Sequence, residues 1–130
     1  MIRNRFHSDQ CCFINGFTEI ALTKLDVLGG LDVLKICVAY ELDGKEIHEM
    51  PPQASALARC KPIYVEMPGF PAHALHEWLE IAKKCNVENL GFSGLPAAAQ
   101  HYIQRLEDLI GAPITSVGVG PDRDATIDKV

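Results

Sequence analysis

The sequence predicts an α/β (mixed α+β) fold, in which two main helices pack on a mixed β-sheet. Two kinds of pattern support this fold class. Short apolar or alternating runs bounded by turn residues are typical of strands. Two longer segments, 72–84 and 96–110, have apolar residues three and four positions apart, as in amphipathic helices. At 130 residues the chain is long enough to bury a core, so residues 1–130 are expected to form a single domain.

Strands are expected at residues 18–22, 34–42, 62–67 and 114–117, with a short last strand at 125–127. The strongest strand pattern is that of residues 34–42. The Asp43-Gly44 pair after it predicts a tight hairpin whose second strand returns through residues 45–48. Residues 50–58 are expected to form a loop or a short helical piece, and the polar residues 1–10 to be poorly ordered.

The two helices have predicted ends and predicted buried faces. The first carries an apolar stripe opposite its charged residues: Leu75, Trp78, Leu79 and Ala82. The second begins at Pro96, because a first-turn residue needs no N–H, and ends at Gly111, which suits the left-handed C-cap. Its inward residues are expected to be Ala99, Tyr102, Ile103, Leu106 and Ile110.

The composition is that of a globular protein, with 48% hydrophobic and 22% charged residues. The formal net charge of −5 argues against a nucleic-acid surface, because a negative chain repels a run of phosphates. No apolar window approaches the roughly 20 residues that span a bilayer, and no secretory signal opens the sequence. A soluble, cytoplasmic protein without a nucleic acid or membrane partner is therefore expected.

Metal and disulfide sites are not expected. The chain has five cysteines without C-x-x-C spacing: Cys11, Cys12, Cys37, Cys60 and Cys85. They are interpreted as reduced thiols, with Cys37 in the core. His73, His76 and Glu77 lie close together in the sequence, but no further residue is placed to complete a tetrahedral metal site.

The segment Thr23-Lys24-Leu25-Asp26, set between two apolar runs, is the clearest candidate binding motif. The Asp26 carboxylate can accept two hydrogen bonds from guanine, one from the ring N1–H and one from the exocyclic amine. Adenine lacks that pair of donors, so this residue would select guanine over adenine. The stem of Lys24 can cover the purine ring while its ammonium stays hydrated. A local cap or turn contact is the alternative role for Asp26.

Residues 12–128 resemble, in order and with similar spacing, the C-terminal part of the adenylosuccinate synthetase family. The segments that carry the resemblance are Ile20 to Leu28, Gly30-Leu31, Leu34 to Tyr40, Tyr64, Met67-Pro68-Gly69, Gly94-Leu95-Pro96, Tyr102-Ile103, Arg105-Leu106-Glu107, Gly120-Pro121-Asp122-Arg123 and Thr126-Ile127. Members of this family join IMP to aspartate with GTP, by phosphorylating the purine 6-oxygen and then displacing the phosphate. The resemblance implies guanine-binding roles for two sets of residues: Lys24, Leu25 and Asp26, and the main chain of Gly118, Val119 and Gly120.

Important parts of the family pattern are absent from this sequence. The family's phosphate-binding loop, catalytic aspartate and histidine, and magnesium site belong to its N-terminal half, and no G-x-x-x-x-G-K pattern occurs here. Phosphoryl transfer depends on positioning and on charge neutralisation. The isolated chain is therefore expected to be inactive, to bind GTP or GDP weakly through the guanine alone, and to contribute neither a catalytic residue nor a metal ligand.

Two further departures concern the guanine turn and the helix before it. The family has Ser-Thr-Gly where this chain has Gly118-Val119-Gly120, a change that keeps the backbone donors and removes hydroxyl contacts. The region 71–92 is about one helical turn longer than the family pattern, with Trp78 as a packing anchor.

Two functions remain open. The chain is either the guanine-recognising portion of a synthetase, which needs an N-terminal part for activity, or a non-enzymatic truncated homologue that binds a partner or itself. Strand edges and apolar surface left uncovered favour association. A homodimer is therefore expected under the second function, with the helix that bears Trp78 as a candidate contact.

Overall fold

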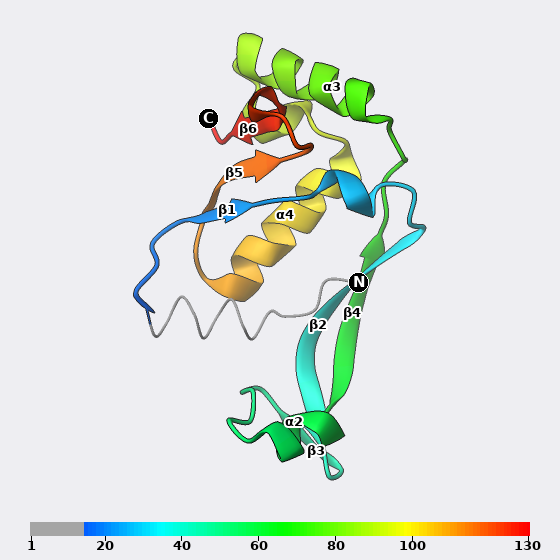
Figure 1. Ribbon diagram of the computed structural model, residues 1–130, viewed down its shortest axis with the longest axis vertical. Coiled ribbons are helices and arrows are strands. Elements are labelled where there is room, and N and C mark those ends of the chain that lie inside the picture. The colour runs from blue at the N-terminus through cyan, green and yellow to red at the C-terminus, as the bar shows by residue number, and fades with distance from the viewer. Residues whose placement is uncertain (1–14) are drawn as a thin grey trace.

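The computed structural model describes residues 15–130, so the predictions for residues 1–10, Cys11 and Cys12 lie outside the described residues. The elements, in chain order, are β1 (Ile20–Leu22), the 3-10 turn η1 (Asp26–Leu28), β2 (Val33–Leu42), β3 (Lys45–Ile47), α2 (Ala54–Arg59), β4 (Lys61–Pro68), α3 (Leu75–Val87), the 3-10 turn η2 (Gly91–Gly94), α4 (Ala97–Ile110), β5 (Ile114–Gly118), the 3-10 turn η3 (Arg123–Ala125) and β6 (Thr126–Asp128). The mixed α/β class is confirmed, with α3 and α4 as the main helices (Figure 1).

The strands divide between two three-stranded sheets, instead of forming the one sheet that the sequence predicted. In the first sheet, of order β1-β5-β6, β1 is parallel to β5 and β6 is antiparallel to β5. In the second, of order β3-β2-β4, all neighbours are antiparallel. The division follows from chain connectivity, because β2 pairs with the strands that follow it directly, whereas β1 pairs with β5 from the far end of the chain.

The second sheet extends away from the rest of the molecule as a long hairpin (Figure 1). The β2–β4 register is interrupted between Cys37 and Ala39, where β2 has an extra residue. Such a bulge rotates the following side chains to a new face. Leu34 and Ile36, before the bulge, belong to the main core, while Cys37, Ala39 and Tyr40 form a separate small cluster. We call residues 37–64, with β3 and α2, the arm and the remainder the body.

The body core lies between the first sheet and the helices, with α4 behind β1 and β5 and α3 alongside β6 and η3 (Figure 1). Its largest fully buried side chains are Trp78, Tyr102, Leu25, Ile36, Ile114 and Ile127. The predicted inward positions of the two helices hold except at one residue. Ile110 is half-buried and packs against the core, as expected, and its neighbour Leu109 is buried as well. Leu75 is instead 60% exposed, because α3 begins at this residue, at the edge of the packed layer.

The predicted ends of the elements agree with local backbone geometry. Pro96 is the N-cap of α4, so the helix begins at Ala97, one position after the predicted start, and Gly111 ends the helix with a φ of 74°. The hairpin turn at Asp43 and Gly44 has positive φ values of 52° and 80°, as a tight turn between twisted strands requires. The segment 50–58, predicted as a loop or a short helical piece, contains most of α2 (Ala54–Arg59).

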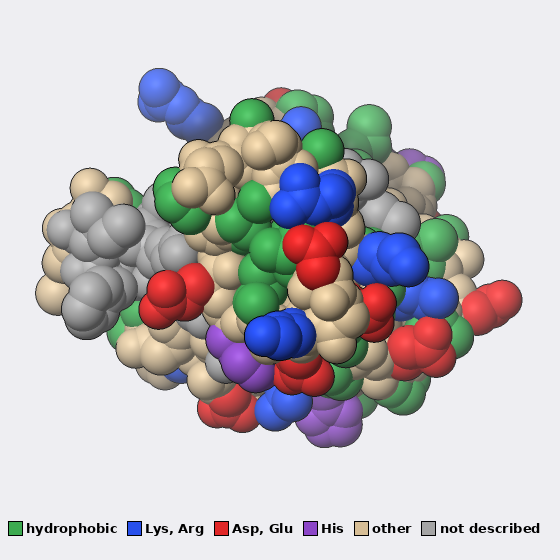
Figure 2. Space-filling view, turned by 90° about the horizontal axis from the view of Figure 1, so that it is seen from below, with side chains coloured by type: hydrophobic (Ala, Val, Ile, Leu, Met, Phe, Trp, Pro, Cys, Tyr) green, Lys and Arg blue, Asp and Glu red, His purple; other side chains and the backbone are tan. Residues whose placement is uncertain are grey.

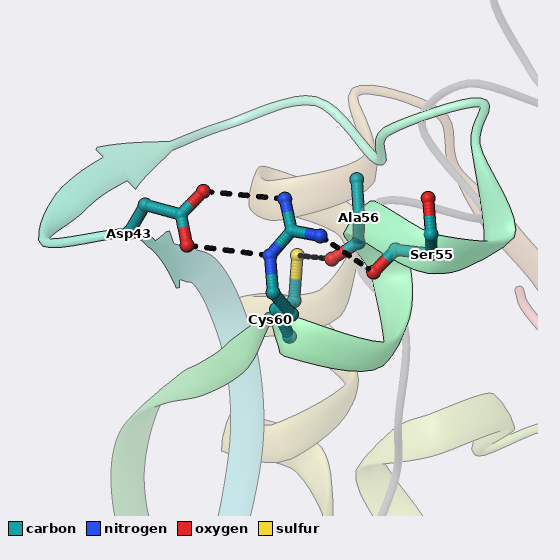
Figure 3. Close-up of polar contacts among 5 residues, drawn as sticks. Asp43, Ser55, Ala56 and Cys60 are labelled. Atoms are coloured by element: carbon teal, nitrogen blue, oxygen red, sulfur yellow. Dashed lines mark hydrogen bonds and ion pairs between the residues drawn. The ribbon is translucent and has the colours of Figure 1, made fainter.

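Polar contacts at the end of the arm tie α2 to the β2–β3 turn (Figure 3). Arg59 donates two hydrogen bonds of 3.3 Å to the Asp43 carboxylate and one of 3.2 Å to the Ser55 carbonyl. The Cys60 thiol donates to the Ala56 carbonyl. Seen end-on, this part of the surface intersperses acidic and basic side chains around a narrow apolar strip, without a patch of one sign (Figure 2). Between residues 15 and 130, no helix combines the length and apolarity that crossing a bilayer requires.

Candidate functional site

The Thr23–Asp26 motif follows β1 directly and makes an abrupt turn. Lys24 has a φ of 60°, in the left-handed region that a residue with a side chain rarely adopts. Leu25 then returns to helical values as the N-cap of η1, whose first residue is Asp26. The turn places Leu25 in the core, with Lys24 exposed and Asp26 half-buried. Left-handed backbone costs about 1–2 kcal/mol per residue, and such conformations cluster at functional sites.

The glycine turn after β5 lies against this motif. The Leu25 N–H donates to the Gly118 carbonyl at 3.0 Å, and Ala21 and Leu22 pair with Ser116 and Val117 in the parallel ladder. A β-carbon added to Gly118 would lie 3.7 Å from Thr23 Cα. Parallel pairing of β1 and β5 therefore brings together the two segments that the sequence marked separately as a guanine site.

Two residues of the predicted set contribute no exposed side chain. Leu25 is 1% exposed and Val119 is 0% exposed, so both side chains belong to the core. Their N–H groups are also used within the protein, because Leu25 donates to Gly118 and Val119 donates to the Ala125 carbonyl at 2.8 Å. The Gly118 carbonyl is likewise used, because it accepts the Leu25 N–H. The groups left for a ligand are therefore the side chains of Lys24 and Asp26 and the Gly120 N–H.

The Asp26 side chain has no partner among residues 15–130. Its carboxylate makes no cap hydrogen bond to η1, and no hydrogen bond or ion pair joins it to another described side chain. The Lys24 ammonium likewise has no hydrogen bond or ion pair in that part of the chain. The cap or turn contact considered for Asp26 is thus not found, and a half-buried carboxylate remains with its acceptors unused.

Leu75 lies next to the candidate site, although its spacing placed it in the inward stripe of α3. In the structure its side chain stands beside the glycine turn, where a β-carbon on Gly120 would lie 4.0 Å from Leu75 Cδ2. The start of α3, η1 and the turn after β5 lie at the same side of the body (Figure 1). Its position at the first residue of a helix was the available signal, since such residues often overhang the packed layer.

Two hollows formed by described residues lie away from the candidate site. One, of about 270 Å³, is lined by residues of η2, α4 and the chain end, including Gln100, Glu107 and Lys129. The other, of about 290 Å³, is lined by Cys85, Asn86 and residues 128–130. Neither is lined by a residue of the predicted guanine site.

Side chains that can bind metal do not gather in the described part of the chain. Within residues 15–130, no three His, Cys, Asp or Glu side chains are grouped so as to hold one ion. His73 instead approaches Glu77 at 3.7 Å and lies edge-on to Trp78 at 5.1 Å between ring centroids. The Glu77 carboxylate also accepts a hydrogen bond from the Ala74 N–H at 2.6 Å, so these residues cap the start of α3.

Comparison with known proteins identifies the family. The family model described as adenylosuccinate synthetase matches residues 6–127. This chain belongs to the adenylosuccinate synthetase family. The synthetase of Mycobacterium marinum is 46% identical over 114 residues, which cover 88% of this chain and 24% of that protein. The synthetase of Methanothrix thermoacetophila is 48% identical over 116 residues, with the same coverage of 88% and 24%.

The fold agrees with a solved adenylosuccinate synthetase. The structure of the fully ligated enzyme from Plasmodium falciparum matches with a TM-score of 0.74 and 30% sequence identity. The match covers 89% of this chain and 26% of that one. The chain thus spans about a quarter of the length of the synthetases that it matches, and the predicted membership of this family is confirmed.

Proposed function

We propose that this chain supplies the guanine-recognising part of an adenylosuccinate synthetase, an enzyme that ligates IMP and aspartate with GTP. The observation that carries the proposal is the half-buried Asp26 carboxylate, which lacks a protein partner in residues 15–130 and adjoins the Gly118–Gly120 turn. Membership of the family, with 46% identity to the Mycobacterium marinum synthetase, supports the same assignment.

Each available group has a chemical role in this proposal. The two oxygens of Asp26 accept hydrogen bonds from the N1–H and the exocyclic amine of guanine, an arrangement that adenine cannot satisfy. The methylenes of Lys24 cover one face of the ring. The Gly120 N–H, which has no hydrogen bond to a residue in 15–130, can donate to the guanine O6.

The phosphates and the magnesium ion of the family reaction are assigned to other parts of a synthetase. Within residues 15–130, no three His, Cys, Asp or Glu side chains lie close enough together to hold a divalent ion. The sequence also contains no phosphate-binding loop. A nucleotide held only by its base binds weakly, because most of the charge interactions with GTP are missing. The chain by itself is therefore proposed to be inactive, and to act together with the remaining three quarters of a synthetase.

The partner surface is proposed to include the outer edge of β1. That strand ends its sheet, so within the described residues one of its edges is unpaired. Large apolar side chains nearby in sequence are exposed: Phe17, Val27, Leu31 and Val33. An unpaired strand edge with exposed apolar residues favours association.

Self-association without catalysis is the second candidate function, and the same exposed surface favours it. Light scattering over a concentration series separates the two candidates. A dimer that persists at micromolar concentration supports the self-associating module, whereas a monomer at high concentration leaves the surface to the remainder of a synthetase.

Calorimetric or NMR titration with GDP, GTP and ADP tests the proposed function. The chain is expected to bind GDP and GTP weakly and ADP at least about tenfold more weakly, because only guanine pairs with Asp26. Asp26→Asn should remove this preference, since the amide presents a donor to the ring N–H groups. Asp108→Asn, an exposed change near the end of α4, is the matched control and should keep the preference. Equal affinity for GDP and ADP would refute the proposal.

A gain-of-function variant tests the glycine turn independently. Gly118→Ser restores the hydroxyl that the family pattern has at this position, and a β-carbon there meets only ordinary contacts of 3.7 and 3.8 Å. It is expected to tighten GDP binding about three- to tenfold, the value of one hydrogen bond. Gly120→Ser is the control, because its β-carbon would lie 3.1 Å from Ala125 Cβ and should strain the turn.

A further inference from the structure

The segment between β4 and α3 braces the turn that carries Asp26. The Gly30 N–H donates to the Phe70 carbonyl at 2.9 Å, and the Gly69 N–H donates to the Asp32 carbonyl at 3.0 Å. A β-carbon on Gly29 would lie 3.1 Å from the Pro71 carbonyl oxygen. These contacts leave no room for a side chain, so the glycines after η1 permit close approach of the two segments.

The same segment continues into Leu75, whose side chain reaches the other half of the site. Leu75 is 60% exposed although its α3 neighbours Trp78 and Ala82 are buried, and its Cδ2 lies beside Gly120. Residues 69–75 therefore touch both the turn after Asp26 and the turn after β5. Leu75 thus presents an exposed aliphatic side chain at the junction of the two segments that are proposed to bind guanine.

Aromatic packing fixes the position from which Leu75 projects. The Trp78 ring lies edge-on to Phe70, with centroids 6.0 Å apart, and to His73, with centroids 5.1 Å apart. Trp78 is 1% exposed, and Glu77 caps the backbone at Ala74. The first turn of α3 is therefore anchored on both sides of Leu75, which limits the entropy lost when a ligand orders that side chain.

We propose that Leu75 is an apolar wall of the guanine site and packs against the purine ring beside Gly120. This inference rests on the proposed function, and it assigns a role to the start of the region 71–92, which the sequence analysis interpreted as longer than the family pattern. A purine has apolar faces and a polar edge, so a site needs aliphatic cover as well as the carboxylate. Covering the ring also excludes water from the hydrogen bonds of Asp26, which strengthens them.

Titration of Leu75→Ala with GDP, by NMR or calorimetry, tests the wall. Loss of the aliphatic cover is expected to weaken GDP binding about tenfold while the melting temperature stays within about 1 °C of wild type, because the side chain is mostly exposed. Leu75→Met, which keeps the apolar volume, should restore affinity to within about twofold. Leu57→Ala, on the exposed surface of α2, is the matched control and should leave GDP affinity unchanged.

The possible failures are distinguishable. If wild type prefers GDP over ADP and Leu75→Ala binds GDP as tightly as wild type does, Leu75 does not contact the base, and the proposed function is unaffected. If wild type does not prefer GDP over ADP, both the proposed function and the role of Leu75 are wrong. If Leu75→Ala changes only self-association measured by light scattering, the side chain belongs to a protein interface and the inference is overturned.

Discussion

The body and the arm reach stability in different ways. In the body, both helices and the β1-β5-β6 sheet share one core, and its polar links are shielded. Glu107, whose side chain is 11% exposed, accepts hydrogen bonds from the Ile114 N–H at 2.7 Å and from Lys129 Nζ at 2.6 Å. The arm has a small buried cluster of Cys37, Ala39 and Tyr40. The ion pair between Arg59 and Asp43 at its end is exposed to solvent.

The contrast explains where the candidate site can be built. Asp26 and the Gly118–Gly120 turn adjoin fully buried residues, so their backbone is held by a large packed region. A binding site requires such rigid support, because small displacements weaken hydrogen bonds to a ligand. The arm lacks this support, and no residue of the predicted site comes from it.

Core truncation is expected to have the largest effect and to separate the two regions. Ile114→Ala, at a position with 0% exposure in the body, should reduce the free energy of unfolding by about 2–5 kcal/mol. Ile63→Ala, at a half-buried position of the arm, should cost about 1 kcal/mol. Urea unfolding followed by circular dichroism measures both.

The single tryptophan, Trp78, reports on the body alone. For Ile63→Ala, the fluorescence and circular dichroism transitions should coincide if arm and body unfold together. Equal losses for Ile63→Ala and Ile114→Ala would contradict the difference drawn between the two cores.

The sequence predicted the features that depend on local signals. Asp43-Gly44 specifies the hairpin and Gly111 the end of α4, because each residue type favours its backbone conformation. The division into two sheets, the bulge before Ala39 and the exposure of Leu75 were not predicted, since they depend on how distant strands pair and where a helix starts. The site shows the same limit: its two motifs were visible separately, but their contact depends on the β1–β5 ladder.

Removing the buried Tyr102 hydroxyl in the body is expected to change stability less than truncating a core residue does. The Tyr102 hydroxyl is buried and has no hydrogen-bond partner in the described structure. Tyr102→Phe should therefore leave the free energy of unfolding unchanged or raise it by about 1 kcal/mol. Tyr40→Phe is the comparison in the arm, and it should not stabilise because the Tyr40 phenol interacts with Cys37.

The pH dependence of these variants gives an independent measurement. Burial raises the pKa of Tyr102 well above its ordinary value of 10.0. The unfolded chain therefore releases the phenol proton at lower pH than the folded chain does. The stability linked to the neutral phenol is complete below about pH 10 and is lost as the pH rises above it. Between about pH 9 and 11, a range centred on the ordinary tyrosine pKa, Tyr102→Phe should lose less free energy of unfolding than wild type does. If stability depends on pH in the same way for both proteins, the raised pKa assigned to Tyr102 is wrong.

The smallest effect is expected at the end of the arm. The Asp43 and Arg59 side chains are 65% and 55% exposed, so their ion pair is screened by water. Asp43→Asn removes the charge and keeps a residue that tolerates the φ of 52°, so the free energy of unfolding should change by less than about 0.5 kcal/mol. Asp43→Ala removes the same ion pair and also disfavours the left-handed turn, so it should cost about 1 kcal/mol more than Asp43→Asn. A loss above about 1 kcal/mol for Asp43→Asn in urea unfolding would show that this surface pair, and not backbone preference, holds α2 to the hairpin.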